Sequence, residues 1–211
     1  MRIIAGVLVV AMSAGMAGAQ GFELLGGAKL EYKHKEEGGR SNAYLSGYIE
    51  GEAMGLYLGI WGQVASSDLL DEVDLYVGYR NETAGGLSYD IGYTRYYYPN
   101  DGGECCGEYT LALGMPLGPV EGKLDLAHDP QSDLNNIYLG GAWAATSAFE
   151  VSGQFGVYQV EGFDSEREWD LGATYALSDT TAVDFRYYDG SEYADSHFGL
   201  AVTWDASLLG R

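Results

Sequence analysis

The 211-residue sequence predicts an all-β protein: a closed, antiparallel, up-and-down transmembrane β-barrel of about 12 strands. Three observations predict it. Apolar and polar residues alternate in short segments, the links between segments alternate in length, and an apolar leader precedes them. The chain carries 31 Asp and Glu against 11 Lys and Arg, a formal charge of -20. This balance excludes a nucleic-acid partner, because neutralising phosphates requires a basic face.

The leader, MRIIAGVLVVAMSAGMAGAQ, has the organisation of a secretory signal peptide. Arg2 gives it a positive start, Ile3 to Met12 form an apolar stretch, and Ala17-Gly18-Ala19 is a small-residue cleavage site. A membrane anchor is the alternative, but a spanning helix needs about 20 strongly apolar residues, and this segment turns to Gly, Ala and Ser halfway. We therefore expect residues 1–19 to be removed and residues 20–211 to form one exported domain.

From Phe22 onward the alternation has a period of two, as in strands with two different faces. Leu75 and Val77, for example, alternate with Asp74 and Tyr76. Each segment is about 10 residues long, the length of a tilted strand that crosses a bilayer. The expected strands are 23–34, 42–51, 55–65, 71–81, 87–98, 106–115, 119–128, 134–145, 149–160, 167–177, 181–189 and 196–205.

The links between these segments fall into two classes. Every second link is short: GEAM, ETAGG, PLG, TSA and LSD. The others are mostly longer and more polar: KEEGGRSN, SSDLLD, NDGGEC, DPQSD, EGFDSERE and DGSEYAD. Short turns at one rim and longer loops at the other are typical of outer-membrane barrels, so we expect both chain ends at the short-turn, periplasmic rim.

Alternation alone leaves two arrangements open. A soluble barrel or sandwich turns its apolar face inward, whereas a membrane barrel turns it toward lipid. The membrane arrangement is favoured because Lys and Arg are scarce and the polar faces carry Gly, Ser, Thr and Tyr, which suit a crowded lumen. Aromatic residues also gather near segment ends, where we expect them at the lipid headgroups: Tyr96, Tyr97, Tyr98, Tyr187, Tyr188 and Trp204.

If the polar face is inside, the lumen contains more acidic than basic side chains. We expect Arg80 and Arg186 to pair with neighbouring acids across strands, and such pairs can equally serve only to brace the barrel. The remaining negative charge should favour cations or neutral solutes over anions. The predicted pore-lining residues are Glu72, Asp74, Arg80, Asp90, Glu108, Lys123, Asp125, Glu168, Asp170, Asp184 and Arg186.

Two features stand apart from this pattern. Arg95 falls on the apolar face beside Tyr97, near the longer-loop rim, where its stem can reach headgroup phosphates as an anchor. Cys105 and Cys106 are adjacent, so they cannot staple distant parts of the chain. A vicinal disulfide in a loop, an intermolecular bond and no function at all remain open, and no metal site is expected because further ligands are lacking nearby.

The block Asp71–Pro99 resembles the TorF porin family of proteobacterial outer membranes. The likeness lies in a D-L-Y-x-G-Y strand at Asp74–Tyr79, a G-L-S-Y-D-x-G strand at Gly86–Gly92 and a Y-x-Y-P exit at Tyr96–Pro99. Gly55–Gly62 also resembles the family's G-x-Y-x-G-x-W segment. The resemblance implies an outer-membrane porin, with no cofactor and no catalytic residue to carry over.

Catalysis is the remaining alternative, with His34, His128 and His197 as candidate bases. Ser196 and His197 cannot form a dyad with each other, because neighbouring residues of a strand point to opposite faces. The sequence also lacks G-x-S-x-G and H-E-x-x-H. We therefore expect no enzyme, but a channel that passes small hydrophilic solutes or cations by diffusion, with outer-membrane lipid around it. A plugged structural or adhesive barrel and a soluble periplasmic binding barrel are the alternatives.

Overall fold

The computed structural model describes residues 21–35, 41–67, 70–160, 162, 164–191 and 196–210. The expected signal peptide, residues 1–19, lies outside the described residues. Among the residues described, no helix has the length and apolar character needed to cross a membrane.

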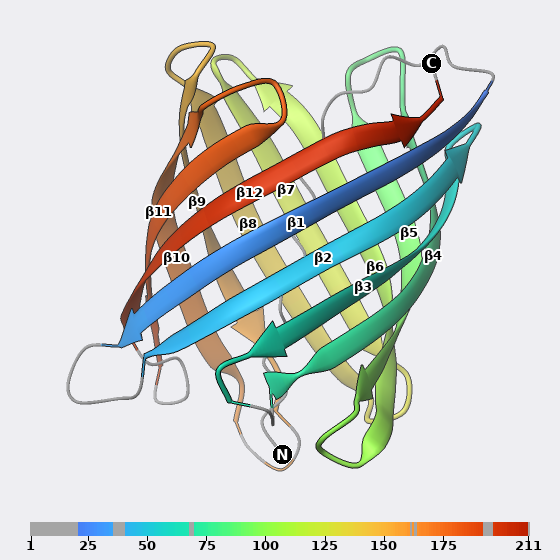
Figure 1. Ribbon diagram of the computed structural model, residues 1–211, viewed down its shortest axis with the longest axis vertical. Coiled ribbons are helices and arrows are strands. Elements are labelled where there is room, and N and C mark those ends of the chain that lie inside the picture. The colour runs from blue at the N-terminus through green and yellow to red at the C-terminus, as the bar shows by residue number, and fades with distance from the viewer. Residues whose placement is uncertain are drawn as a thin grey trace.

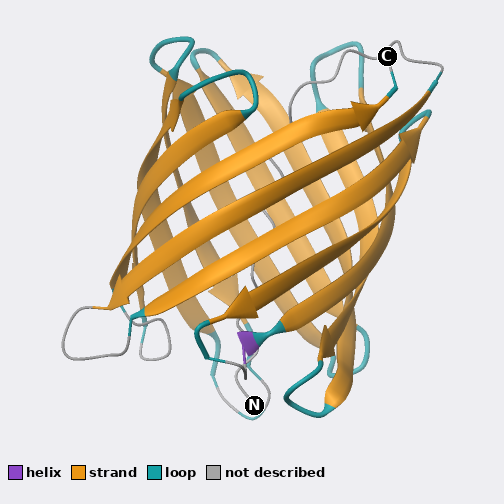
Figure 2. Cartoon of the chain, viewed as in Figure 1, coloured by secondary structure: helices purple, strands orange, loops and turns teal. Residues whose placement is uncertain are grey.

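The described residues form twelve strands that wind steeply around a common axis (Figure 1). Almost the whole wall is strand, with turns and loops at its two ends (Figure 2). The strands are β1 (Phe22–Lys35), β2 (Asn42–Ala53), β3 (Leu56–Ala65), β4 (Glu72–Glu82), β5 (Ser88–Tyr98), β6 (Gly103–Leu117), β7 (Val120–Asp129), β8 (Leu134–Ala144), β9 (Phe149–Tyr158), β10 (Glu166–Ala176), β11 (Thr181–Gly190) and β12 (His197–Leu209).

Each strand pairs antiparallel with its sequence neighbours, and β12 closes the barrel by pairing with β1. The order therefore leaves no strand edge unpaired. The predicted fold class, a closed antiparallel transmembrane barrel of twelve strands, is confirmed. The closing pair extends from Lys35 opposite His197 to Leu24 opposite Leu209, so the last strand continues beyond its predicted end at residue 205.

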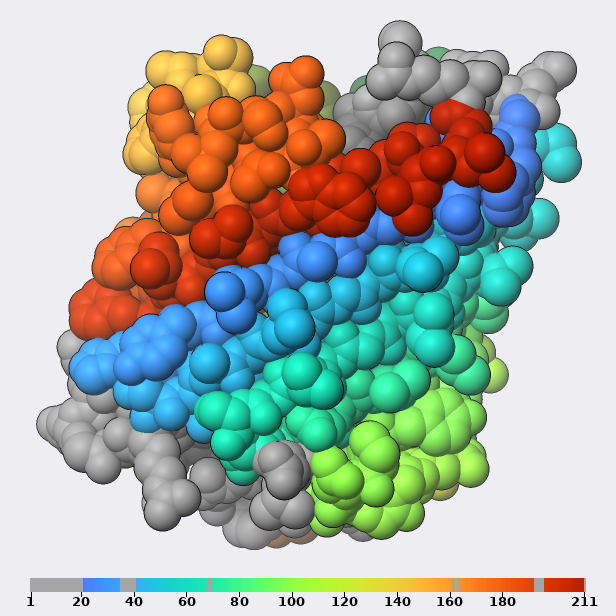
Figure 3. Space-filling view, viewed as in Figure 1, coloured from blue at the N-terminus to red at the C-terminus, as the bar shows by residue number. Residues whose placement is uncertain are grey.

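The two faces of the wall differ as a membrane barrel requires. Leu58 and Leu139 are 68% and 65% exposed, whereas the alternating positions turn inward, with Glu50 and Tyr138 only 3% and 4% exposed. Apolar side chains thus cover the outside, where β12, β1, β2 and β3 form continuous diagonal bands (Figure 3). The soluble-barrel alternative is wrong, because it would place these apolar side chains inside.

Both ends of the described chain lie at one rim, since Leu24 pairs with Leu209. That rim carries the turns 54–55, 83–87, 118–119, 145–148 and 177–180. At 54–55, Met54 and Gly55 both have positive φ, 53° and 84°, which matches the twist of a two-residue hairpin.

At the opposite rim, here called the outer mouth, lie the links 99–102 and 130–133, and the strands on either side of residues 36–41, 66–71, 159–165 and 191–196 also have their ends there. The expectation that these are the longer links is wrong for two of them. Links 99–102 and 130–133 are no longer than the turn at 145–148. The first is short because β6 begins at Gly103, three residues before its predicted start.

Candidate functional site in the barrel lumen

The inner face of the barrel brings together side chains that lie on strands two apart. Arg80 of β4 reaches Glu50 of β2, and Tyr57 of β3 reaches Asp90 of β5. Such contacts form on the concave side of the wall, where curvature brings alternate strands closer. The eleven predicted lining residues occupy positions of inward parity in their strands: Glu72, Asp74, Arg80, Asp90, Glu108, Lys123, Asp125, Glu168, Asp170, Asp184 and Arg186.

Arg80 lies at the centre of one ion-pair network in the half of the lumen nearer the chain ends. Its guanidinium pairs with Glu50 and, at 3.1 Å, with Glu52. The same group lies 4.1 Å from the centre of the Tyr57 ring, a cation–π geometry. Tyr57 in turn donates a hydrogen bond of 2.5 Å to Asp90. The network binds four adjacent strands together from the inside.

Arg186 forms a second network near the middle of the barrel. Its guanidinium pairs with Asp170 and, at 3.1 Å, with Asp184, and it donates a hydrogen bond of 2.9 Å to the Ser152 hydroxyl. Gly172 makes room for it, since a Cβ there would lie 2.7 Å from the Arg186 Cζ. The expected pairing of both arginines with acids across strands is confirmed.

The lysines of the inner face are also paired. Lys123 lies 3.0 Å from Asp125, and Lys29 and Lys33 lie 3.2 Å and 4.0 Å from Glu31. Each of these basic side chains thus has an acidic partner, and Lys29 and Lys33 share Glu31. Acids outnumber bases there, so a negative surplus remains.

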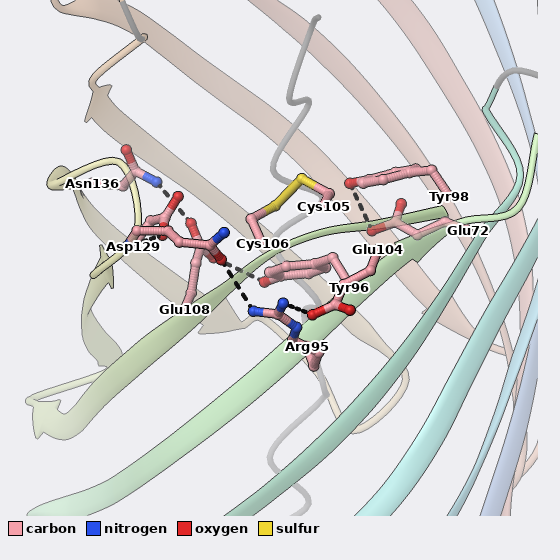
Figure 4. The surroundings of a disulfide bond; sticks show 11 residues. Glu72, Arg95, Tyr96, Tyr98, Glu104, Cys105, Cys106, Glu108, Asp129 and Asn136 are labelled. Atoms are coloured by element: carbon pink, nitrogen blue, oxygen red, sulfur yellow. Dashed lines mark hydrogen bonds and ion pairs between the residues drawn. A yellow bond between two sulfur atoms is a disulfide. The ribbon is translucent and has the colours of Figure 1, made fainter. Parts of the chain in front are cut away.

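Part of that surplus forms a group at the outer mouth. Glu72 is the first residue of β4, and Asp74 follows on the same face. Asp74 interacts electrostatically with Glu72 and with Glu108 of β6. We call Glu72, Asp74 and Glu108 the mouth cluster. Tyr98 donates a hydrogen bond of 3.1 Å to Glu72, and Tyr96 donates one of 2.8 Å to Glu108 (Figure 4).

Only neutral groups hold the mouth cluster in place. Asn136 of β8 donates a further hydrogen bond, 3.3 Å long, to Glu108. Among the described residues, no Lys or Arg forms an ion pair with any of the three carboxylates. Asp74 is 7% exposed, and its Oδ1 has no hydrogen-bond partner. An unmet buried acceptor costs about 1–3 kcal/mol.

Three tyrosines that were expected at the lipid headgroups lie on the inner face instead. Tyr96, Tyr98 and Tyr188 do not lie at the lipid headgroups. The first two bond to carboxylates of the lumen, and Lys33 lies 5.2 Å from the centre of the Tyr188 ring. The alternation could have shown this, since Tyr96 and Tyr98 share the parity of the inward Asp90. Nearness to a strand end does not decide which face a side chain takes.

The cysteines also differ from expectation, because they lie in strand β6 rather than in a loop. The register of β5 and β6 shifts between Arg95 and Tyr97, so Cys105 and Cys106 together lie opposite Tyr96. This is a β-bulge, in which two residues face one. The two cysteines form a disulfide within the bulge, beside the mouth cluster (Figure 4).

Arg95 has protein partners that the sequence did not reveal. Its guanidinium forms an ion pair with Glu104 at the start of β6 (Figure 4). It also donates a hydrogen bond of 3.1 Å to Gln131. These contacts tie β5 to the neighbouring strand and to the link 130–133 at the outer mouth. The headgroup-anchor role stays a prediction.

The described residues give little basis for catalysis or metal binding. No group of three or more His, Cys, Asp or Glu among them is arranged to hold a metal ion. His34 Nδ1 lies 3.0 Å from the Ser41 hydroxyl, but none of the hydrogen bonds between described residues joins His34 to a carboxylate that could orient its ring. His128 hydrogen-bonds Asn135 at 3.1 Å.

The fold is similar to those of solved porins. The KdgM porin superposes with a TM-score of 0.66 at 9% identity, covering 84% of this chain and 98% of that one. The KdgM porin in complex with disordered oligogalacturonate gives 0.65 at 7% identity, covering 84% and 98%. The NanC porin gives 0.62 at 11% identity, covering 87% and 100%. At these identities the likeness shows the fold alone.

In sequence, no curated protein is significantly similar to the chain. A family model does match, over residues 42–203, which is most of the barrel. The model is described as "Bacterial protein of unknown function (Gcw_chp)", and the chain belongs to this family.

Proposed function

We propose that this barrel is a channel of the bacterial outer membrane that passes small hydrophilic solutes by diffusion and weakly prefers cations. The observation that carries the proposal is the inverted wall, with apolar side chains outside and an acidic surplus inside. The porin neighbours support the channel class. The resemblance of residues 71–99 to the TorF porin family points the same way, and a signal peptide at residues 1–19 would provide export.

The cation preference follows from which charges are neutralised. Arg80 and Arg186 each pair with two acids, so neither offers an unpaired positive charge to an anion. The mouth cluster, in contrast, has no basic partner among the described residues. A low-dielectric wall focuses the field of this surplus along the axis. We therefore infer that polyanions such as the oligogalacturonate bound to KdgM are not the solutes of this channel.

Planar-bilayer recording tests the proposal. In a salt gradient, the reversal potential of the purified protein should have the sign of a cation-selective channel. Exchange of the mouth-cluster acids for amides should reduce the potential. An anion-selective potential would show that the paired arginines, and not the surplus acids, dominate the lumen field.

A structural barrel closed by its own side chains is the second candidate. The Arg80 and Arg186 networks favour it, since each connects side chains across the inner face. The complete absence of channels in a protein that migrates as a folded barrel would support this candidate. We propose no catalytic role, because the porin-like wall and the isolated His34–Ser41 contact give no oriented nucleophile and base.

A further inference from the structure

We propose that the mouth cluster is a binding site for the primary ammonium group of small organic cations that enter from the outer mouth. This inference rests on the proposed function, because it names the class of solute that the channel selects. Three carboxylates, Glu72, Asp74 and Glu108, come together there from β4 and β6, with β5 between them.

The first argument is the unmet acceptor. Asp74 is 7% exposed, and its Oδ1 receives no hydrogen bond. Buried carboxylate oxygens are normally satisfied by donors, and an exception requires a physical reason. A ligand with N–H groups supplies the donor that this oxygen lacks. The orphaned oxygen therefore points to a missing donor, independently of the charge of the cluster.

The second argument is that the cluster is pre-organised. Glu108 accepts hydrogen bonds from Tyr96 and Asn136, and Glu72 accepts one from Tyr98. These donors are neutral side chains, so they fix the carboxyl groups without forming ion pairs with them. Carboxylate oxygens keep further lone pairs for an ammonium group.

The third argument concerns the kind of cation. The described carboxylate, His and Cys side chains include no group of three arranged around one metal ion. An ammonium group is larger, and its three N–H donors reach oxygens at hydrogen-bond rather than coordination distances. An ammonium group can donate to the unmet Asp74 oxygen without such an arrangement of ligands.

Three acids deeper in the lumen are already paired with arginine. Asp170 and Asp184 are saturated by Arg186, and Glu50 by Arg80. An amine that enters from the outer mouth thus meets unpaired carboxylates before it reaches the arginine networks. Binding should depend on the side of the membrane to which the amine is added.

Calorimetry on the full barrel in detergent micelles tests the site without any need for conduction. The probe is 1,4-diaminobutane, charged at neutral pH because alkyl ammonium pKa values lie near 10.4, and 1,4-butanediol is its uncharged counterpart. The diamine should bind saturably and the diol should not. Asp74→Asn should weaken diamine binding about tenfold or more, since it removes a charge-assisted contact.

Glu150→Gln is the matched control, because it removes one inward carboxylate near the chain-end rim of β9. Its diamine affinity should stay within about twofold of the parent. Equal effects of the two substitutions, equal binding of diol and diamine, or no saturable diamine binding would overturn the inference. If Asp74→Asn does not migrate as a folded barrel, Glu108→Gln takes its place, with the same expected loss and the same refuting results.

Bilayer recording separates this inference from the proposed function. Diamine added at the outer mouth should block the current at lower concentration than diamine added at the other side. Open channels without a side-dependent diamine block would overturn the site alone. Absence of channels together with Asp74-dependent binding in micelles would overturn the channel alone.

Discussion

Leu139→Arg tests whether the apolar face of the barrel wall points toward lipid. Leu139 is the sixth of the eleven residues of β8, close to the middle of the barrel, and is 65% exposed. It is paired with Leu124 and Phe155, which continue the apolar surface on both sides. An arginine at the midplane of a membrane barrel costs about 2–4 kcal/mol. We therefore expect the folding equilibrium to fall roughly 30- to 700-fold.

The matched control is Leu177→Arg, the same exchange at the chain-end rim. Leu177 is 58% exposed and directly follows β10, so an arginine there can reach the headgroups. The expected cost is only about 0–1 kcal/mol. Urea unfolding in lipid vesicles, followed by tryptophan fluorescence, measures both variants. If Leu139→Arg cost as little as is expected for Leu177→Arg, about 0–1 kcal/mol, Leu139 would face water and the membrane placement of the wall would be refuted.

Three further predictions concern the lumen. Gly78→Ala places a Cβ against the Tyr57 hydroxyl and should destabilise the barrel by about 1–3 kcal/mol in the same unfolding assay; unchanged stability would show that the ring moves freely. Arg186→Met keeps the apolar stem but leaves two carboxylates unpaired, so we expect a loss of about 3–5 kcal/mol and a larger cation-selective reversal potential, whereas a smaller potential would contradict the charge argument. Joint exchange of Cys105 and Cys106 to serine should weaken diamine binding while the barrel still folds, and dithiothreitol should have the same effect on the parent; unaltered affinity would mean that the disulfide does not position the cluster.

The number of strands and the face of most side chains could be predicted because both depend on local periodicity. Successive side chains of a strand point to opposite faces, so the face of every residue follows once the face of one residue is known. Leu75, outward, and Asp74, inward, follow from that rule alone. The alternation alone could not show whether the apolar face contacts lipid or forms a dry core. The scarcity of Lys and Arg and the pattern of links favoured lipid, and the exposed leucines of the structure agree.

The strand β6 was predicted poorly because a bulge breaks the parity rule. Two residues, Cys105 and Cys106, occupy the place of one, so the alternation before the bulge is out of step with the alternation after it. The run NDGGEC also contains turn-forming residues, which made a loop the natural interpretation. Only the pairing with β5 shows that Gly103 already belongs to the strand.

Which acids are neutralised depends on contacts between strands, and no single segment of the sequence contains this information. The partner of Arg80 is Glu50, two strands away, and their meeting requires the stagger between strands that closure of the barrel imposes. The same stagger leaves the mouth cluster beyond the reach of both arginines. Part of the unpaired charge therefore lies at the entrance, whereas Arg80 and Arg186 pair with acids deeper in the lumen. We therefore expect weak cation selectivity in conduction to coexist with measurable binding at the mouth.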